Sequence, residues 1–309
     1  GLPLFYQVRG PFCSIVFFKP HFTKNMSDDI LLKQILGPFK EYRKVQPKEE
    51  ETIDDGTGVI KVLFFPVDDI SANEFGYEWK MKTVKDEFYG TTSKTGVLRS
   101  LSEEEVTTRK GIRVSNKDGG YHSTPDFLQR LIDDEIDDDI AKKQEMAMFF
   151  GRFLRFLRKH VESFPSLKTP PPITTSWINR LSVNNSNGLH NHADAKLSGV
   201  FYFEDYEADV DAEWRGAKEP RPGDLLLRTA SSAKRKNETV GEWCEYVVIR
   251  PQRGKLVLFE PNLLHGVVPS HRERFSLAMN FGEKNVSFED PNEGGKKVTV
   301  RPISLDNKP

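Results

Sequence analysis

The segment from Leu189 to Asp194 carries three side chains of the types that bind metal ions. It reads Leu-His-Asn-His-Ala-Asp, with imidazoles at positions 190 and 192 and a carboxylate at 194. If the segment is extended, side chains alternate between two faces, and these three lie on the same side. His192 and Asp194 at a strand end would then hold two adjacent positions around one ion. We predict a metal site here, against the plainer alternative in which both side chains only bind backbone groups of a turn.

A third ligand must come from elsewhere, and His265 is the best candidate. It lies 73 residues after His192, in the run Leu263–Pro269 near a predicted strand. Two imidazoles and one carboxylate on one side of an ion leave the remaining positions open, which is the ligand set of non-haem Fe(II) sites. The spacing therefore favours Fe(II) held by His192, Asp194 and His265.

The strand-like run 274–280 adds a candidate carboxylate receptor. Every second residue from Arg274 onward is polar or small, and the residues between them are apolar. The apolar face is expected in the core, so the polar face lines an interior. A guanidinium with the Ser276 hydroxyl two residues on offers a planar pair of donors and one further donor to a carboxylate. The alternative is a surface arginine paired with Glu273 or Glu283.

The elements that must position these residues are mainly β-strands with supporting helices. Ser123–Asp126 has the composition of a helix start, and apolar residues follow at helical spacing there and again over about 140–162. After Pro172, short strand-like runs alternate with turn signals, which favours a jelly roll or barrel over a parallel sheet. One turn is expected over 184–188. The predicted strands are 173–183, 196–204, 223–228, 245–250, 254–259, 265–268, 274–282 and 297–303.

We divide the chain into an N-terminal extension, residues 1–120, packed on the core, and a catalytic part, residues 121–309. The extension is expected to be of mixed α/β character. It contains predicted strands at 13–18 and 59–65 and a short predicted helix over about 28–36.

Composition excludes several classes of function. A chain of 309 residues with 22 Phe can bury a large core, and a net charge of −1 gives no electrostatic basis for nucleic-acid binding. No apolar run approaches the roughly 18–20 residues of a membrane span. Two cysteines form no disulfide framework and favour an intracellular, cytoplasmic location. Gly1 is not a natural start, so the sequence leaves open whether an upstream targeting segment has been removed.

Several of these segments together resemble the 2-oxoglutarate/Fe(II)-dependent oxygenases, over about residues 121–282. The similarity rests on a tryptophan strand at Ser176–Asn179, the His-x-His pair, the run Leu197–Tyr202, and the strand Gly254–Pro261 ahead of His265. It is greatest to a poorly characterised group in which His-x-His precedes Leu-Ser-Gly-Val-x-Tyr. The first 120 residues match no family pattern.

The resemblance implies a double-stranded β-helix, which is a jelly-roll or cupin-like fold. It also implies 2-oxoglutarate and O2 as co-substrates, with Fe(II) on His192, Asp194 and His265. The far carboxylate of 2-oxoglutarate would pair with Arg274 and Ser276. Further candidates are Tyr202 and Asn280 for the co-substrate, and His190, Asn184 and Trp177 for the substrate or for support of the ligands.

The His-x-His pattern leaves two candidates for the first ligand. We choose His192, because only it has a carboxylate two residues on. If the ligand were His190, Asp194 would not be one, and the site would resemble those of halogenases or of oxygenases with two histidine ligands. His122 has no partner pattern and is expected to be structural or exposed.

The predicted reaction is hydroxylation of an unactivated C–H bond of a small molecule, with succinate and CO2 as co-products. Desaturation and ring closure are other outcomes of the same chemistry. One alternative is a hydroxylase of prolyl or aspartyl side chains in proteins, which an open groove would favour over a closed pocket. Another is a non-enzymatic, cupin-like binding module, which would not require Arg274.

Overall fold

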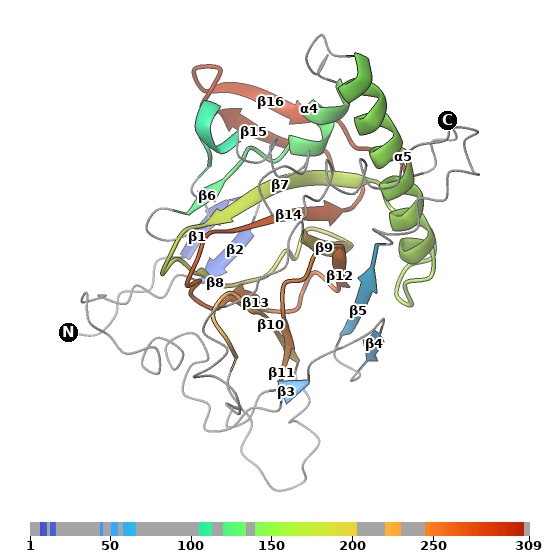
Figure 1. The fold of residues 1–309 in the computed structure, drawn as a ribbon, viewed down its shortest axis with the longest axis vertical. Coiled ribbons are helices and arrows are strands. Elements are labelled where there is room, and N and C mark those ends of the chain that lie inside the picture. Colours follow the sequence, from blue (N-terminus) through green and yellow to red (C-terminus); the bar gives the residue numbers. More distant parts are fainter. Residues whose placement is uncertain are drawn as a thin grey trace, which may run out of the picture.

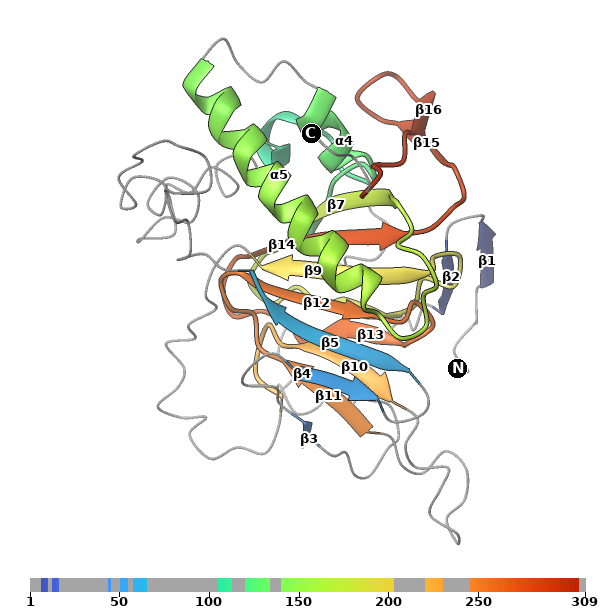
Figure 2. The same cartoon turned by 90° about the vertical axis from the view of Figure 1, so that its right-hand side faces the viewer.

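The computed structural model contains two β-sheets that face each other, with a long helix across the outer face of the larger one (Figures 1 and 2). The structure describes residues 7–10, 13–16, 44–45, 51–54, 58–65, 105–112, 120–133, 140–202, 220–229 and 245–305. Besides a helical turn at 105–108, it contains the helices α4 (Phe127–Asp133) and α5 (Ile140–Glu162), which the sequence predicted. Within this part of the chain, neither helix has the length and apolar character needed to cross a membrane.

The strands are short, and most pair antiparallel. Those before the helices are β1 (Gln7–Gly10), β2 (Cys13–Val16), β3 (Lys44–Val45), β4 (Glu51–Asp54), β5 (Val59–Phe64) and β6 (Tyr121–His122). Those after the helices are β7 (Ile173–Leu181), β8 (Asn187–His190), β9 (Leu197–Tyr202), β10 (Leu225–Thr229), β11 (Glu245–Ile249), β12 (Lys255–Phe259), β13 (His265–Val267), β14 (Arg274–Phe281), β15 (Val286–Asp290) and β16 (Lys296–Val300).

The strand order identifies the fold. The larger sheet has the order β4-β5-β12-β9-β14-β7-β6, and the smaller one has the order β3-β11-β10-β13-β8. Of the eight consecutive strands from β7 to β14, four lie in each sheet, and the chain crosses repeatedly between them. Two sheets built by such crossings are a jelly roll, so the predicted double-stranded β-helix is confirmed.

Each predicted strand overlaps a strand of the structure, but β1, β3, β4, β6, β15 and, near the site, β8 were not predicted. Strand β8 falls where a turn was expected over 184–188, because Asn187-Gly188 has the composition of a turn. Pairing with β13 makes this segment a strand despite its composition. The predicted strand at 297–303 is β16, which forms a separate hairpin with β15. The predicted helix over 28–36 lies outside the described residues.

Two apolar cores lie on the two sides of the larger sheet. The outer core joins the apolar face of β14, which includes Phe275 and Leu277, to Phe153 and Leu157 of α5. This is the face that alternation along β14 predicted. The inner core lies between the sheets and includes Leu225, Leu227, Val247, Ile249, Val257 and Phe259. The polar face of β14 therefore points toward the space between the sheets.

The N-terminal 120 residues contribute edge strands to both sheets. Strand β5 pairs antiparallel with β12, and β4 pairs with β5. Strand β3 pairs parallel with β11 in the smaller sheet. Lys61 of β5 also donates from Nζ to the backbone carbonyl of Ser163, just beyond α5.

Strand β8 contains a bulge. His190 pairs with His265 and Asn187 pairs with Val267, so β8 uses one more residue than β13 between the two pairs. An extra residue shifts the alternation of side chains. As a result Asn187 and His190, three residues apart, are both buried and line the same pocket. The backbones approach closely here, since a Cβ at Gly266 would lie 2.9 Å from the Asn187 carbonyl oxygen.

We expect Gly266→Ala to destabilise the protein by about 1–3 kcal/mol, because the new methyl group must push β13 away from β8. Gly188→Ala is the matched control, since a Cβ there meets nothing within 4 Å. Urea unfolding of both variants measures the difference. Equal midpoints for Gly266→Ala and wild type would contradict the close approach.

Candidate metal and co-substrate site

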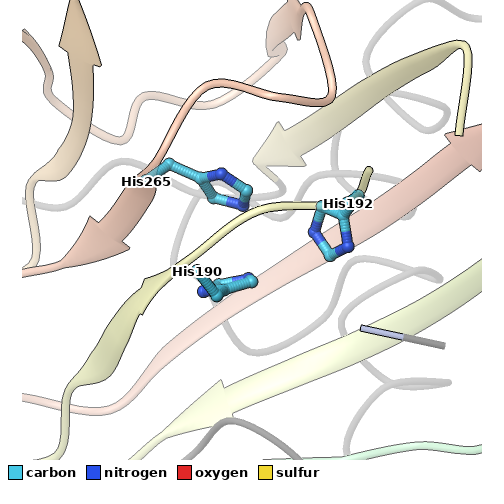
Figure 3. A group of neighbouring side chains, drawn as sticks. All are labelled: His190, His192 and His265. Atoms are coloured by element: carbon cyan, nitrogen blue, oxygen red, sulfur yellow. The ribbon is translucent and has the colours of Figure 1, made fainter. Parts of the chain in front are cut away.

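Three imidazoles meet between the sheets (Figure 3). His190 ends β8, His192 follows in the next loop, and His265 begins β13 opposite His190. Their candidate ligand nitrogens all lie within 4.8 Å of one another. The ring centroids are 4.2 Å apart for His190 and His265, 5.0 Å for His190 and His192, and 5.1 Å for His192 and His265. This spacing suits three ligands of one ion.

Backbone carbonyls fix the protonation of two of these rings. Nδ1 of His190 lies 2.7 Å from the Gly188 oxygen, and Nδ1 of His265 lies 3.0 Å from the Leu263 oxygen. A carbonyl oxygen only accepts, so each Nδ1 carries the proton and donates it. Nε2 of each ring then keeps its lone pair for a metal, which is how histidine ligands are usually oriented.

The electrostatic environment keeps the three rings neutral at pH 7. Burial lowers the pKa of His190. For His192 and His265 burial is again the main cause, and repulsion from His190 adds to it, so that both pKa values fall well below the usual range. Neutral imidazole is the ligand form that Fe(II) and similar divalent ions accept. The residues therefore fit a divalent metal.

The structure does not bring Asp194 to this group. The chain turns after His192, whose carbonyl oxygen accepts from the Ala195 N–H at 2.8 Å. The segment is therefore not extended, and the alternation that would align residues 192 and 194 ends. Instead, the Asp194 carboxylate accepts from Lys284 Nζ at 3.2 Å, and its side chain is 55% exposed. His190, the alternative first ligand in the sequence, joins the group.

The imidazoles open into a pocket lined by both sheets. Arg274 and Ser276 line this pocket, and Arg274 is only 2% exposed. The surface pairing considered for Arg274 is not formed, because Glu273 pairs with Arg180 and Glu283 pairs with Lys196. The polar face predicted for β14 thus provides a buried cation to the pocket.

The surroundings of Arg274 leave hydrogen-bonding capacity unused. Within the described residues, its Nε and the Tyr202 hydroxyl are buried without a hydrogen-bond partner. The guanidinium carbon lies 5.0 Å from the centroid of the Tyr202 ring. Burial raises the pKa of Tyr202, and the nearby guanidinium partly opposes this, so the phenol stays protonated. A buried cation with unused donors is the arrangement that an anionic ligand completes.

Sheet register extends this polar region across three strands. Ser276 pairs with Asn179 on β7 and with Tyr202 on β9, so these three side chains form one row. Asn179 was not predicted as a site residue, although it shares a face with Trp177 two residues earlier. Trp177 contacts His192 at a centroid distance of 5.6 Å. Two residues of strand span about 7 Å, which separates the polar row from the level of Trp177.

The remaining predicted residues lie in different surroundings. Trp177 lines the pocket. Asn280 uses its Oδ1 to accept from the Ser198 hydroxyl at 2.9 Å. Asn184 lies in an exposed turn with a φ of 65°, and its N–H donates to the Ser270 carbonyl. Neither asparagine lines the pocket, whereas Asn187, which sequence reasoning missed, does so because of the bulge.

Comparison with solved structures finds similar folds at low identity. An oxidoreductase of the 2OG-Fe(II) oxygenase family from Burkholderia pseudomallei has 14% identity and a TM-score of 0.36 over 60% of this chain and 78% of that one. A Pseudomonas putida prolyl-4-hydroxylase has 14% identity and a TM-score of 0.37 over 61% and 85%. SnoN, an alpha ketoglutarate dependent epimerase from nogalamycin biosynthesis, has 12% identity and a TM-score of 0.43 over 82% and 85%.

No curated protein matches the chain. Residues 175–280, about a third of the chain, match the model of a family described as "Putative 2OG-Fe(II) oxygenase". The matched segment contains His190, His192 and His265 as well as Arg274 and Ser276. Through this segment, the chain is similar to the 2OG-Fe(II) oxygenases.

Proposed function

We propose that His190, His192 and His265 bind Fe(II), that Arg274 binds 2-oxoglutarate, and that the enzyme oxidises a small molecule. The observation that carries this proposal is one pocket that contains three neutral imidazoles and a buried guanidinium with an unused donor. When bound, iron and 2-oxoglutarate supply the activation of O2, with succinate and CO2 as co-products.

The protein orients the co-substrate through the polar row. Arg274, Ser276 and Tyr202 offer donors to the far carboxylate of 2-oxoglutarate, and Asn179 lies beside them. Because the row lies about 7 Å along the sheet from the level of Trp177, an extended five-carbon diacid can reach from it toward the imidazoles. Charge-assisted bonds to the buried Arg274 guanidinium favour the dianion strongly.

The position and lining of the pocket favour a small polar substrate. It lies between the two sheets rather than across an outer face, which favours a small molecule over a protein side chain. Asn179 and Asn187 are buried in its wall, and Oδ1 of each is without a hydrogen-bond partner among the described residues. The 2-oxoglutarate dianion carries no hydrogen-bond donor, so these acceptors suit a substrate with hydroxyl or N–H groups.

Iron-dependent conversion of 2-oxoglutarate to succinate tests the proposal. The purified protein is expected to form succinate slowly with Fe(II), O2 and 2-oxoglutarate, to stop with a chelator, and to recover with excess Fe(II). His265→Ala should reduce the rate at least about 100-fold, because an incomplete ligand set loses the metal. Succinate formation that needs neither iron nor His265 would reject the oxygenase centre. Metal binding without any turnover would favour the binding module.

A further inference from the structure

We propose that His122 and Trp177 position His192, the one imidazole of the group that lies outside a strand. This rests on the proposed function, because it assumes that the three imidazoles bind a metal. His122 and Trp177 act here as positioning residues, and neither is assigned a contact with the reacting atoms.

His192 is held differently from the other two rings. His190 and His265 each donate from Nδ1 to a backbone carbonyl. Within the described residues, no hydrogen bond fixes the ring of His192; its hydrogen bonds are made by its backbone, whose N–H donates to the Pro261 oxygen at 2.8 Å and whose carbonyl accepts from Ala195. The ring contacts Trp177 instead, at 5.6 Å between centroids and an interplanar angle of 60°. Aromatic packing therefore takes the place of the hydrogen bond that usually orients a histidine ligand.

Trp177 is itself held by His122. The two rings are stacked at 5.1 Å between centroids and 16° between planes. The stack follows from register, because His122 on β6 pairs with Asn179 on β7 and is thus the diagonal neighbour of Trp177 on the same face. His122 is anchored by its Nδ1, which lies 2.7 Å from the Ser123 oxygen.

The stack is a contact between neutral rings. Burial lowers the pKa of His122 to about 4, so its imidazole is uncharged at pH 7. Trp177 is only 7% exposed, and His122 on one side restricts its rotation. The indole edge therefore limits the orientations open to His192. Removing either ring should let His192 rotate while His190 and His265 keep their carbonyl bonds.

Titration with Co(II) alone tests this without turnover, because the visible absorption of Co(II) reports its ligands. We expect Trp177→Leu and His122→Ala to raise the Kd for Co(II) about 10- to 100-fold and to shift the absorption bands. Trp177→Phe and His122→Phe, which keep an aromatic ring, should stay within about threefold of wild type. Phe275→Leu is the matched control, because it truncates a buried ring on the opposite face of the sheet. It should lower Tm and leave the spectrum unchanged.

The Co(II) titrations separate a positioning role of His122 and Trp177 from a general loss of packing. An unchanged Kd and spectrum in His122→Ala, the variant at the sheet edge, would overturn the positioning role even if Trp177→Leu failed to fold. Equal shifts in Phe275→Leu would show a general loss of packing and would also overturn it. A failure of the proposed function is recognised separately, because then wild type and His265→Ala would bind Co(II) alike.

Discussion

Alanine at position 192 is expected to lower the rate of succinate formation about 1,000-fold, whereas alanine at position 194 is expected to change it less than about twofold. The loss of a metal ligand removes the centre, and a factor of 1,000 corresponds to about 4 kcal/mol. Asp194 is half-exposed and pairs with Lys284 at the surface. Exposed pairs of this kind contribute about 0–1 kcal/mol. Initial rates and bound iron per protein measure both effects.

This pair of variants decides between two ligand sets. Equal losses in His192→Ala and Asp194→Ala would restore the set of two imidazoles and one carboxylate read from the spacing of the sequence. Asp194→Asn is the control that keeps the shape of the side chain and removes its charge. A loss confined to His192→Ala supports the three imidazoles.

Replacing Arg274 by leucine is expected to raise the KM for 2-oxoglutarate about 100-fold. Charge-assisted hydrogen bonds contribute about 1.5–3 kcal/mol each, and leucine removes the charge and all donors. Arg274→Lys keeps the charge without the planar pair of donors, so an increase of about tenfold is expected. The KM is measured from succinate formation, and the Kd for 2-oxoglutarate is measured with the metal-loaded protein in the absence of O2.

Glu273 provides the neighbouring control. Its carboxylate pairs with Arg180 away from the pocket, so Glu273→Gln should leave the KM for 2-oxoglutarate unchanged. An Arg274→Leu enzyme that binds 2-oxoglutarate as wild type does would show that the far carboxylate is held elsewhere.

Strand periodicity accounts for what could be predicted from the sequence. Along β14 the apolar residues recur at every second position, so the core face and the pocket face follow directly, and Arg274 follows with them. The jelly roll could be inferred from the number of short strands after the helices. The helices α4 and α5 could also be predicted, because a helix start and apolar residues at helical spacing can be recognised within each helical segment alone.

The features that escaped prediction depend on pairing between distant segments. The turn after His192 removes the alignment with Asp194, and the bulge in β8 comes from its register with β13. Asn179 and His122 gain their places only when β7 has β14 on one side and β6 on the other. No local pattern encodes these relations, so the places of Asn179, Asn187 and His122 became visible only in the folded chain.

The pairing of β5 with β12 bears on how this protein can be shortened. The matched segment begins at residue 175, but β12 within it takes its outer partner from residues 59–64. A fragment that began after the N-terminal third would leave β12 with open N–H and C=O groups and bare valine and leucine side chains. Such an edge recruits other chains and aggregates. Residues 59–64, which lie outside the family match, are thus expected to protect the edge of β12 from pairing with other chains.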